Sequence, residues 1–425
     1  MRPFVAGISL VFIGGVLLSH PQEQVLFTNP EKSRTDAAAD WFSEDDGWFE
    51  TSLQLDDFLQ TASVRDALDW HGLSTESSRE DLLSLLPEVI YVRGNLEKMR
   101  GSAGEDAGTG AVAFSMSLAN GTADSTSIVA SSFNMIVNVN GTIEHMETTF
   151  GITGSSRSVG FKFSPADPDQ MLVALENTGS EQGSWMTWNY RASRDGSISS
   201  KFEQVAGGRD DLNCRDIQMS ASTHSFWGVS YPRARTLSCQ CELSDSAAHP
   251  QISDNTTAGF ARYGPGGDVL EYYDLSPVAS DLDHVQLIED DTQAIVSDKR
   301  RNFVAKFDLT TESLVWVAGG AHGSLSLVDE DGHSSQAGES DASLFHGQHS
   351  GEYFGDNEYF VFDNRVEWDE AGGARRLSNQ SRLMIVKVDE EEDVAQAVWH
   401  YDLGFHTPYF GDCDRLATGN ILSAG

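Results

Sequence analysis

The sequence predicts an all-β protein of the repeated-blade kind, a β-propeller, behind a short helical N-terminal segment. Three observations lead to this prediction. After about residue 111, short alternating apolar runs are separated by turn residues, which is the pattern of sandwiches and propellers. Gly (39) far outnumbers Pro (11), as suits a chain with many tight turns. The third observation is a loose internal repeat in which each unit ends in a tryptophan.

The first twenty residues have the pattern of a targeting segment. Met1-Arg2-Pro3 gives a basic start, an apolar stretch runs from Phe4 to Leu18, and the chain is polar from Ser19 onward. An apolar core of about 7–15 residues is typical of a signal peptide, whereas a membrane-spanning helix needs about 20. We expect residues 1–20 to be a signal peptide and the protein to be secreted or lumenal. A retained N-terminal membrane anchor is the alternative.

Residues 21–110 are expected to form a polar stem with two helices. The spacing of apolar residues is helical from Asp56 to Met99. The second helix starts at a capping box, Ser77-x-x-Glu80, and Pro87 kinks or divides it. Residues 101–110 are rich in Gly, Ala and Asp and are expected to be a linker. The propeller is expected to occupy residues 111–425.

Strand signals dominate the chain after this linker. An apolar run from Met135 to Val139 leads into Asn140-Gly141, a strong hairpin-turn signal. Two later units, at 294–316 and 359–399, share one order of features: a strand, an "x-V/A-K-x-D" strand, an acidic turn and an "L/A-V-W" strand. Such repeats are typical of propeller blades, because one blade cannot bury both of its faces without its neighbours. We expect the tryptophans to fill the space between blades.

The charge excludes some partners. The formal net charge is −37 and the sequence pI is about 4.4. Nucleic acid binding depends on neutralisation of phosphates by Lys and Arg, so a nucleic acid partner is not expected. An anionic membrane is not expected either. We interpret the acidity as that of a solvated surface.

Two residue types support an oxidising compartment. Four N-x-S/T sequons predict N-glycosylation in a eukaryotic source; they begin at Asn120, Asn140, Asn255 and Asn379. Four cysteines are candidates for disulfides, with three pairings open; they are Cys214, Cys239, Cys241 and Cys413. Cys239 and Cys241 are too close to favour bonding to each other. Zinc is the rival, although no second close pair completes a site.

Loops that carry histidine stand out in the second half, because propeller loops converge near the central channel. They include Asp281 to Gln286, Phe345 to Ser350, Phe362 to Arg365, and Gly404 to Pro408. His346 and His349 form an H-x-x-H pair, but no third metal ligand follows at a suitable spacing. Asp329 to Gly332 is similar to part of a calcium loop and is more simply an acidic turn. No metal or other cofactor is expected.

An ordered set of motifs resembles the arylsulfotransferases of the PAPS-independent, six-bladed propeller type. The set runs from 255 to 425 and contains D-x-x-H-x-Q (His284, Gln286), "V-W-V-A-G-G" from Val315, "F-H-G-Q-H-S" from Phe345, "F-D-N" from Phe362, Ser381-Arg382, "V-W-H-Y" from Val398 and "L-A-T-G-N-I-L" from Leu416. The resemblance is faint over 130–250 and absent before 110.

The resemblance implies sulfuryl transfer from a phenolic sulfate donor to a phenol acceptor, through a sulfated histidine and without a nucleotide. A neutral imidazole is a nucleophile near neutral pH, and cationic groups stabilise the negative oxygens in flight. By their motifs, His284 and His349 would bind the sulfuryl group and Arg365 would be the catalytic arginine, with Arg382 as its substitute. His406 is the candidate nucleophile.

Two departures from the family pattern bear on this interpretation. The sequence stops at Gly425 inside the "G-N-I-L" strand, so we expect either an incomplete closing blade or a truncated sequence. Arg215-Asp216 stands where relatives have a His-Asp pair. The rival function is a non-catalytic propeller that serves as a binding or cell-surface interaction module, since the fold alone does not decide function. The two hypotheses differ in whether the four candidate side chains converge.

Overall fold

A computed structural model gives the structure of the protein. It describes residues 10–13, 24–25, 48–60, 65, 68–69, 72–82, 89–95, 111–120, 129–138, 143–148, 156–164, 170–177, 183–189, 202–209, 216–230, 258–264, 267–339, 342–368, 374–407, 411–415 and 421–424. Asn140, Asn255, Cys214, Cys239 and Cys241 lie outside the described residues. The statements below concern the described residues alone.

Antiparallel sheets make up most of the described chain. The first three are a pair, a three-stranded sheet and a four-stranded sheet. Their strands are β3 (Trp48–Gln54) with β4 (Val89–Asn95); β5 (Ala111–Asn120), β6 (Val129–Asn138) and β7 (Ile143–Thr148); and β8 (Ser156–Phe163), β9 (Gln170–Asn177), β10 (Gly183–Asn189) and β11 (Phe202–Arg209).

Two further four-stranded sheets follow in chain order, each built as an antiparallel meander. They consist of β12 (Gln218–Met219), β13 (Phe226–Ser230), β14 (Gly259–Tyr263) and β15 (Val269–Asp274); then β16 (Leu282–Ile288), β17 (Gln293–Asp298), β18 (Phe303–Asp308) and β19 (Ser313–Ala318).

The next sheet has six strands in the order β21-β20-β27-β26-β23-β22. Its members are β20 (Ser326–Val328), β21 (Ser334–Ser335), β22 (His349–Gly355), β23 (Glu358–Asp363), β26 (Arg382–Asp389) and β27 (Val394–Asp402). Strand β20 runs parallel to β27, whereas the other pairings are antiparallel. A separate hairpin, β24 (Val366–Trp368) with β25 (Ala374–Arg376), follows β23.

The remaining sheet combines strands from both ends of the sequence, in the order β2-β1-β29-β28. Its strands are β1 (Leu10–Ile13), β2 (Gln24–Val25), β28 (Asp412–Arg415) and β29 (Ile421–Ala424). Strand β1 therefore falls within the stretch predicted to be a signal peptide, and that prediction stays a prediction.

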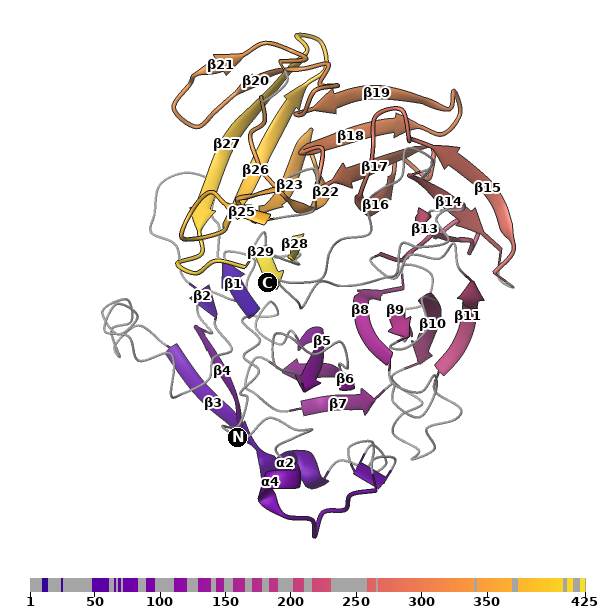
Figure 1. Ribbon diagram of the computed structural model, residues 1–425, viewed down its shortest axis with the longest axis vertical. Coiled ribbons are helices and arrows are strands. Elements are labelled where there is room, and N and C mark those ends of the chain that lie inside the picture. The colour runs from indigo at the N-terminus through magenta and orange to yellow at the C-terminus, as the bar shows by residue number, and fades with distance from the viewer. Residues whose placement is uncertain are drawn as a thin grey trace.

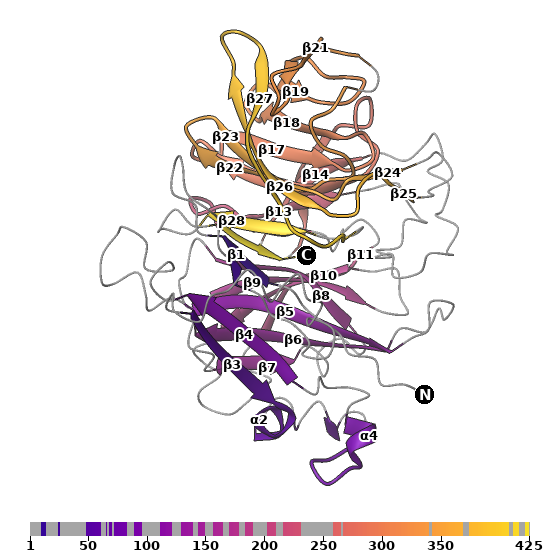
Figure 2. The ribbon, with the colours of Figure 1, turned by 90° about the vertical axis from the view of Figure 1, so that its left-hand side faces the viewer.

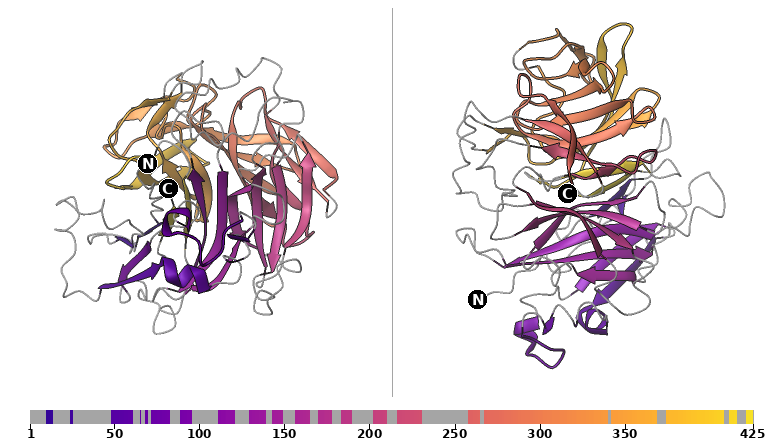
Figure 3. Two further views of the ribbon diagram at one scale, coloured as in Figure 1. Left: turned by 60° about the horizontal axis from the view of Figure 1, so that its bottom comes forward. Right: turned by 90° about the vertical axis from the view of Figure 1, so that its right-hand side faces the viewer.

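The sheets follow one another around a common centre, from β8–β11 through β12–β15 and β16–β19 to the sheet of β22 (Figure 1). Two side views show the same succession of stacked sheets (Figures 2 and 3). In five of them one strand (β8, β12, β16, β22 or β28) stands at one end of the sheet order and faces the common centre (Figure 1). Strand β16 contacts β12 and β22, and β22 contacts β28. We call these five the inner strands. The all-β prediction is confirmed, and the arrangement is that of a propeller; the number of blades stays a prediction.

The predicted repeat corresponds to equivalent strands of two neighbouring sheets. Its first unit forms β17, β18 and β19, and its second forms β23, β26 and β27. Trp316, 3% exposed, packs with Tyr359 and with residues of both sheets in one core cluster. Its ring meets that of Tyr359 edge-on at 5.0 Å. Trp316 therefore fills the space between the two sheets, as expected, while Trp399 is half-buried and stacks on Tyr401.

The stem differs from its prediction in one respect. Two short helices are present, α2 (Leu55–Gln60) and α4 (Arg79–Leu82). The helical interpretation is wrong for Val89–Asn95, which forms β4 and pairs with β3. Pro87 cannot continue a helix, and the Val-Ile-Tyr-Val run that follows it has high strand propensity. No helix of the described residues is long and apolar enough to cross a membrane.

Candidate functional site

His284 lies at the start of inner strand β16, beside an irregularity in the sheet. The register of β16 against β17 shifts between Leu282 and His284, and that of β22 against β23 shifts between His349 and Gly351. Two of the predicted site histidines therefore stand at equivalent bulges of neighbouring inner strands. A β-bulge re-aims side chains, which explains why such bulges are frequent next to active sites.

The imidazole of His284 is held by a buried carboxylate. Its Nδ1 lies 3.0 Å from Oδ2 of Asp216, and both side chains are 3% exposed. Asp216 precedes β12 and also accepts the backbone N–H groups of Ile217 (2.8 Å) and Val285 (3.0 Å). The Nε2 atom of His284 is buried and has no hydrogen-bond partner. The ring is thus oriented through Nδ1, and Nε2 is left for another group.

Lys162 of β8 completes this cluster. Its ammonium lies 2.9 Å from Oδ1 of Asp216 and 3.7 Å from Oε1 of Glu352 in β22. Burial lowers the pKa of Lys162, but the fields of Asp216, Asp412 and Glu352 outweigh it and raise that pKa. Burial likewise opposes ionisation of Asp216, whereas Lys162 and His284 bring its pKa well below the usual range. Asp216 and Lys162 are therefore an ion pair at neutral pH. These five residues come from five inner-strand regions.

The other three predicted residues meet at one turn after β23. Asn364 Oδ1 lies 2.8 Å from Nδ1 of His349, and its Nδ2 donates to the carbonyl of Thr407 at 2.9 Å. Hydrogen bonds to the backbone of Arg365 and Asn364 place the His406 ring at the same turn. We call Asn364 and Arg365 with these neighbours the Asn364 turn. The side chains of His349 and His406 contact this turn, and Arg365 belongs to it through its backbone, while its guanidinium pairs with Asp402.

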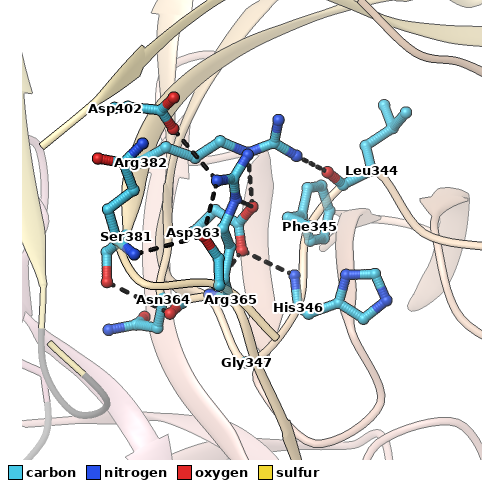
Figure 4. Close-up of polar contacts among 12 residues, drawn as sticks. Leu344, Phe345, His346, Gly347, Asp363, Asn364, Arg365, Ser381, Arg382 and Asp402 are labelled. Atoms are coloured by element: carbon cyan, nitrogen blue, oxygen red, sulfur yellow. Dashed lines mark hydrogen bonds and ion pairs between the residues drawn. The ribbon is translucent and has the colours of Figure 1, made fainter. Parts of the chain in front are cut away.

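A strand-end aspartate shapes this turn. Asp363 Oδ1 accepts the backbone N–H groups of His346 (2.9 Å) and Arg365 (3.0 Å), and Oδ2 accepts Nε of Arg382 at 2.8 Å. Arg365 has a left-handed backbone, with φ 55°. Figure 4 shows Asp363 at the centre, with the two arginines on one side and the His346 backbone on the other. Asp363 therefore fixes both the loop before β22 and the turn after β23.

The two arginines have different surroundings. Arg382, 8% exposed, donates to Asp363, to Glu330 (2.6 Å) and to the carbonyl of Leu344 (2.9 Å). Its guanidinium is fully used in packing the loops together. Arg365 lies 3.2 Å from Asp402 and 3.1 Å from Ser378, with a side chain 23% exposed (Figure 4). Arg365 would have to leave these partners to bind an anion, and it is the more accessible of the two.

His406 and His346 are biased toward the neutral form. Burial lowers the pKa of His406, and Arg376 lowers it further; the backbone hydrogen bonds named above act the other way without reversing the shift. Burial also lowers the pKa of His346, against the field of Asp363. The Nε2 atom of His406 is buried and has no hydrogen-bond partner. His406 therefore carries an unengaged ring nitrogen at a turn that two other predicted residues share.

The structure also describes some of the predicted glycosylation and disulfide positions. Asn379 is exposed, whereas Ser381 of the same sequon is buried and bonds the carbonyls of Asn364 (3.3 Å) and Thr407 (3.1 Å). Asn120 and Cys413 lie in β5 and β28, where the structure describes only their backbone. Among the described residues, no group of three or more His, Cys, Asp or Glu side chains is arranged to hold a metal ion.

Sequence reasoning missed Lys162, Glu352 and Asp412, and it noted Asp216 without seeing its partner. None of these belongs to a motif, and they are separated along the chain by at least one whole sheet. The sequence did contain one signal for the aspartates that hold the loops: Ser297-Asp298 and Phe362-Asp363 end equivalent strands of the repeat. Asp298 holds the loop before β16 through the N–H groups of Ser280 (2.5 Å) and Asp281 (2.7 Å), as Asp363 holds the loop before β22.

Residues 282–425 match the family model described as Arylsulfotransferase (ASST). This segment contains all four predicted site residues, and residues 1–281 lie outside it. No curated protein matches the chain.

Among solved structures, the chain is similar to a periplasmic gluconolactonase of Pseudomonas aeruginosa, with 12% identity, 72% of each chain covered and a TM-score of 0.39. It is also similar to a protein of unknown function from Bacteroides caccae (11% identity, 65% of this chain and 79% of that one, TM-score 0.37). A third is the WD40 domain of a Toxoplasma gondii coronin (11% identity, 72% and 67%, TM-score 0.31). These identities and scores carry no activity to this chain.

Proposed function

We propose that this chain transfers a sulfuryl group from a phenolic sulfate ester to a phenol, with a histidine as its transient carrier. The observation that carries the proposal is the Asn364 turn, where His349, Arg365 and His406 meet within the segment that matches the arylsulfotransferase model. A scaffold without chemistry would not need three such side chains at one turn.

His406 is the proposed nucleophile. Its lowered pKa favours the neutral imidazole, and Nε2 has no hydrogen-bond partner. The Nε2 lone pair forms a bond to sulfur while the bond from sulfur to the aryl oxygen breaks, and the phenolate leaves with that electron pair. The acceptor oxygen then attacks the same sulfur, and the S–N pair returns to the imidazole. The proton that the acceptor phenol loses is balanced by the one that the released phenolate gains.

The other residues act on the charge of the transferred group. We assign His349 and His284 to binding of the sulfuryl oxygens and Arg365 to stabilisation of the charge that develops on them. Arg365 is held by Asp402, whose side chain is 38% exposed, so an incoming anion can compete for the guanidinium. Loss of one such donor costs about 10²–10³ in kcat.

The test is an assay with 4-nitrophenyl sulfate as donor and a panel of phenols as acceptors. We expect nitrophenol release that depends on acceptor, is abolished in His406→Ala and falls steeply in His349→Ala. His333→Ala is the matched control, because His333 is 79% exposed and lies in another turn. A mass gain of one SO₃ on the wild type with donor alone, absent in His406→Ala, would identify the carrier.

Failure of this assay has a definite meaning. If the folded wild type releases no nitrophenol with any acceptor, the chain is a non-catalytic module that binds a partner through the same scaffold. The ion pair of Arg365 with Asp402 is the observation that favours this alternative, since it leaves the guanidinium already satisfied.

We further propose that the chain passes through the secretory pathway, with the N-terminal stretch as its signal and the cysteines oxidised. The exposed position of Asn379 is compatible with a glycan. Expression in a eukaryotic host, followed by glycosidase treatment, should lower the apparent mass, and Asn379→Gln should remove part of that shift. Recovery of the protein inside the cells, unglycosylated and reduced, would contradict this proposal.

A further inference from the structure

The cluster around His284 lies partly outside the segment that matches the family model. Asp216 and Lys162 precede residue 282, yet they are the side chains that hold the His284 ring. They come from the sheets of β8 and β12, so two sheets that the family match does not include contribute to the environment of a predicted site residue.

Four donor groups surround the carboxylate of Asp216, two at each oxygen. Its Oδ1 accepts from Ile217 N–H and lies beside the ammonium of Lys162, while Oδ2 accepts from Val285 N–H and lies beside Nδ1 of His284. A carboxylate so completely bonded has one position, and it imposes one position on the imidazole. An acidic or carbonyl partner on one ring nitrogen is the usual means of fixing the orientation and tautomer of a functional histidine.

The local charge favours a positive imidazole. Lys162 is surrounded by three carboxylates, those of Asp216, Glu352 and Asp412. The Oδ1 atom of Asp412 also accepts the hydroxyl of Ser350, at 2.8 Å, next to His349. One ammonium does not balance three carboxylates, of which those of Asp216 and Glu352 are buried, and an uncompensated buried charge is costly. An imidazolium at His284 supplies the nearest further positive charge.

Nε2 of His284 is the one ring atom left for a ligand. The residue is 2% exposed and Nε2 has no hydrogen-bond partner, which is an unfavourable state for a buried N–H group. An oxygen of a sulfuryl group, or of another tetrahedral oxyanion, would satisfy it.

We propose that Asp216 is a positioning residue that holds His284 as an imidazolium, with its Nε2–H directed at an oxygen of the transferred sulfuryl group, and that Lys162 positions Asp216. This inference rests on the proposed function for the identity of the ligand, but not for the state of His284. Asp216 and Lys162 touch no reacting atom. They act through the ring, and the chemistry assigned to His284 is donation of a hydrogen bond.

The state of His284 is tested directly by nitrogen-15 NMR of the full chain labelled at histidine, with His284→Gln to identify its signals. At neutral pH we expect both ring nitrogens of His284 to be protonated in the wild type and Nε2 to lose its proton in Asp216→Asn. Inorganic sulfate, used as the probe, should shift the Nε2 signal in the wild type and not in Asp216→Asn. Asp329→Asn is the matched control, because Asp329 Oδ2 makes the same contact with Nδ1 of the exposed His333, at 3.1 Å.

The kinetic arm uses the sulfuryl-transfer assay. Asp216→Asn should lower kcat by about 10–100-fold, the usual effect of removing an outer partner of a functional histidine, with KM within about threefold of wild type. Lys162→Arg, which keeps the charge that anchors Asp216, should retain most of the activity. Lys162→Met should lower kcat through displacement of Asp216, while His284 keeps both ring protons because a positive charge beside it has been removed. Asp329→Asn should match wild type. If Asp216→Asn does not fold, the two Lys162 variants and the wild-type spectrum decide.

The outcomes separate the two proposals. A wild type that is inactive overturns the proposed function, while the spectra still decide the state of His284. If the wild type is active, either of two results overturns the inference. One is a neutral His284 in the wild type. The other is an Asp216→Asn variant that folds and leaves both kcat and the His284 spectrum unchanged.

Discussion

At the scale of single residues, the two histidines with unengaged Nε2 atoms differ in their electrostatic surroundings. His406 lies where burial and Arg376 lower its pKa, whereas Nδ1 of His284 lies 3.0 Å from the buried carboxylate of Asp216. The protonation states proposed for the two rings are opposite, and such a difference between two groups of the same type is a frequent basis for assigning nucleophile and donor. The division of labour proposed here follows from that difference.

The pKa of His406 predicts a shape for the pH–rate profile. A lowered pKa keeps the imidazole neutral below pH 6.5, so kcat/KM should begin to fall only at a pH below that of a free histidine side chain. Arg376→Gln removes one cause of the lowering and should move the acid limb upward. Arg375→Gln is the control, because the neighbouring Arg375 pairs with Glu367 at the surface. An acid limb above pH 6.5, or one that Arg376→Gln leaves in place, would show that His406 is not the group titrated.

The site could be predicted only in part, and the missing part has a physical cause. His284 and His349 stand in motifs that keep their order along the chain, and Arg365 directly follows one, whereas His406 is a candidate by its position toward the C-terminus and not by a motif. Lys162 and Asp216 join them only through closure of the sheets around the centre, since a pair 54 residues apart in sequence has no local pattern. Asn364 is part of a motif, but its role depends on Thr407, to which no spacing rule points.

At the scale of elements, the fold follows closely from local pattern. The repeat predicted β17–β19 and β23, β26 and β27 because alternation and tryptophan position are local properties. The insertion that forms β20 and β21 was not predicted, since it pairs with β27 across more than 60 residues. The strand β4 was missed because a helical spacing of apolar residues outweighed the β-branched run after Pro87.

Trp316 connects two sheets, and its removal should be costly. It packs edge-on against Tyr359, and its indole N–H donates to Oε1 of Glu390 at 3.0 Å, an oxygen that also accepts from Lys306 at 2.8 Å. Trp316→Ala should lower the free energy of unfolding by about 3–5 kcal/mol, measured by denaturant unfolding. Val315→Ala, at the neighbouring and 44% exposed position, should change it by less than about 0.5 kcal/mol. Equal effects of the two would contradict the packing role.

Gly228 of β13 packs closely against Trp185 and against the backbone of Asp216, which holds His284. A Cβ atom there would lie 2.3 Å from Cζ2 of Trp185 and 2.9 Å from the carbonyl oxygen of Asp216. Gly228→Ala should therefore destabilise the protein by about 1–3 kcal/mol and displace Asp216. We expect loss of thermal stability together with a changed His284 NMR signal. A variant with the stability and the His284 spectrum of the wild type would show that Trp185 yields without disturbing Asp216.

At the scale of the whole molecule, the charge is the dominant property. A net charge of −37 makes the native surface repel itself, and salt screens exposed charges more than buried pairs. Raising the NaCl concentration from 20 mM to 0.5 M should raise the midpoint of thermal unfolding, by about 1 °C for each kcal/mol of repulsion relieved in a chain of this length. KCl at the same ionic strength should act equally. A midpoint that falls would mean that ion pairs such as Lys306–Glu390 outweigh the net repulsion.

The parallel pairing of β20 with β27 has a consequence for how copies of this molecule meet. A strand at the edge of a sheet offers free N–H and C=O groups to any other chain, and β27 would be such an edge without β20 and β21. The outer side of that sheet is instead occupied by a segment of the same chain. Among the described residues, no strand covers the outermost strand of the sheet of β12: β15 ends that sheet, with Val269 and Leu270 40% and 51% exposed. The edge of β15 is therefore a place where a foreign strand could add to the sheet, whereas β27 is covered by β20.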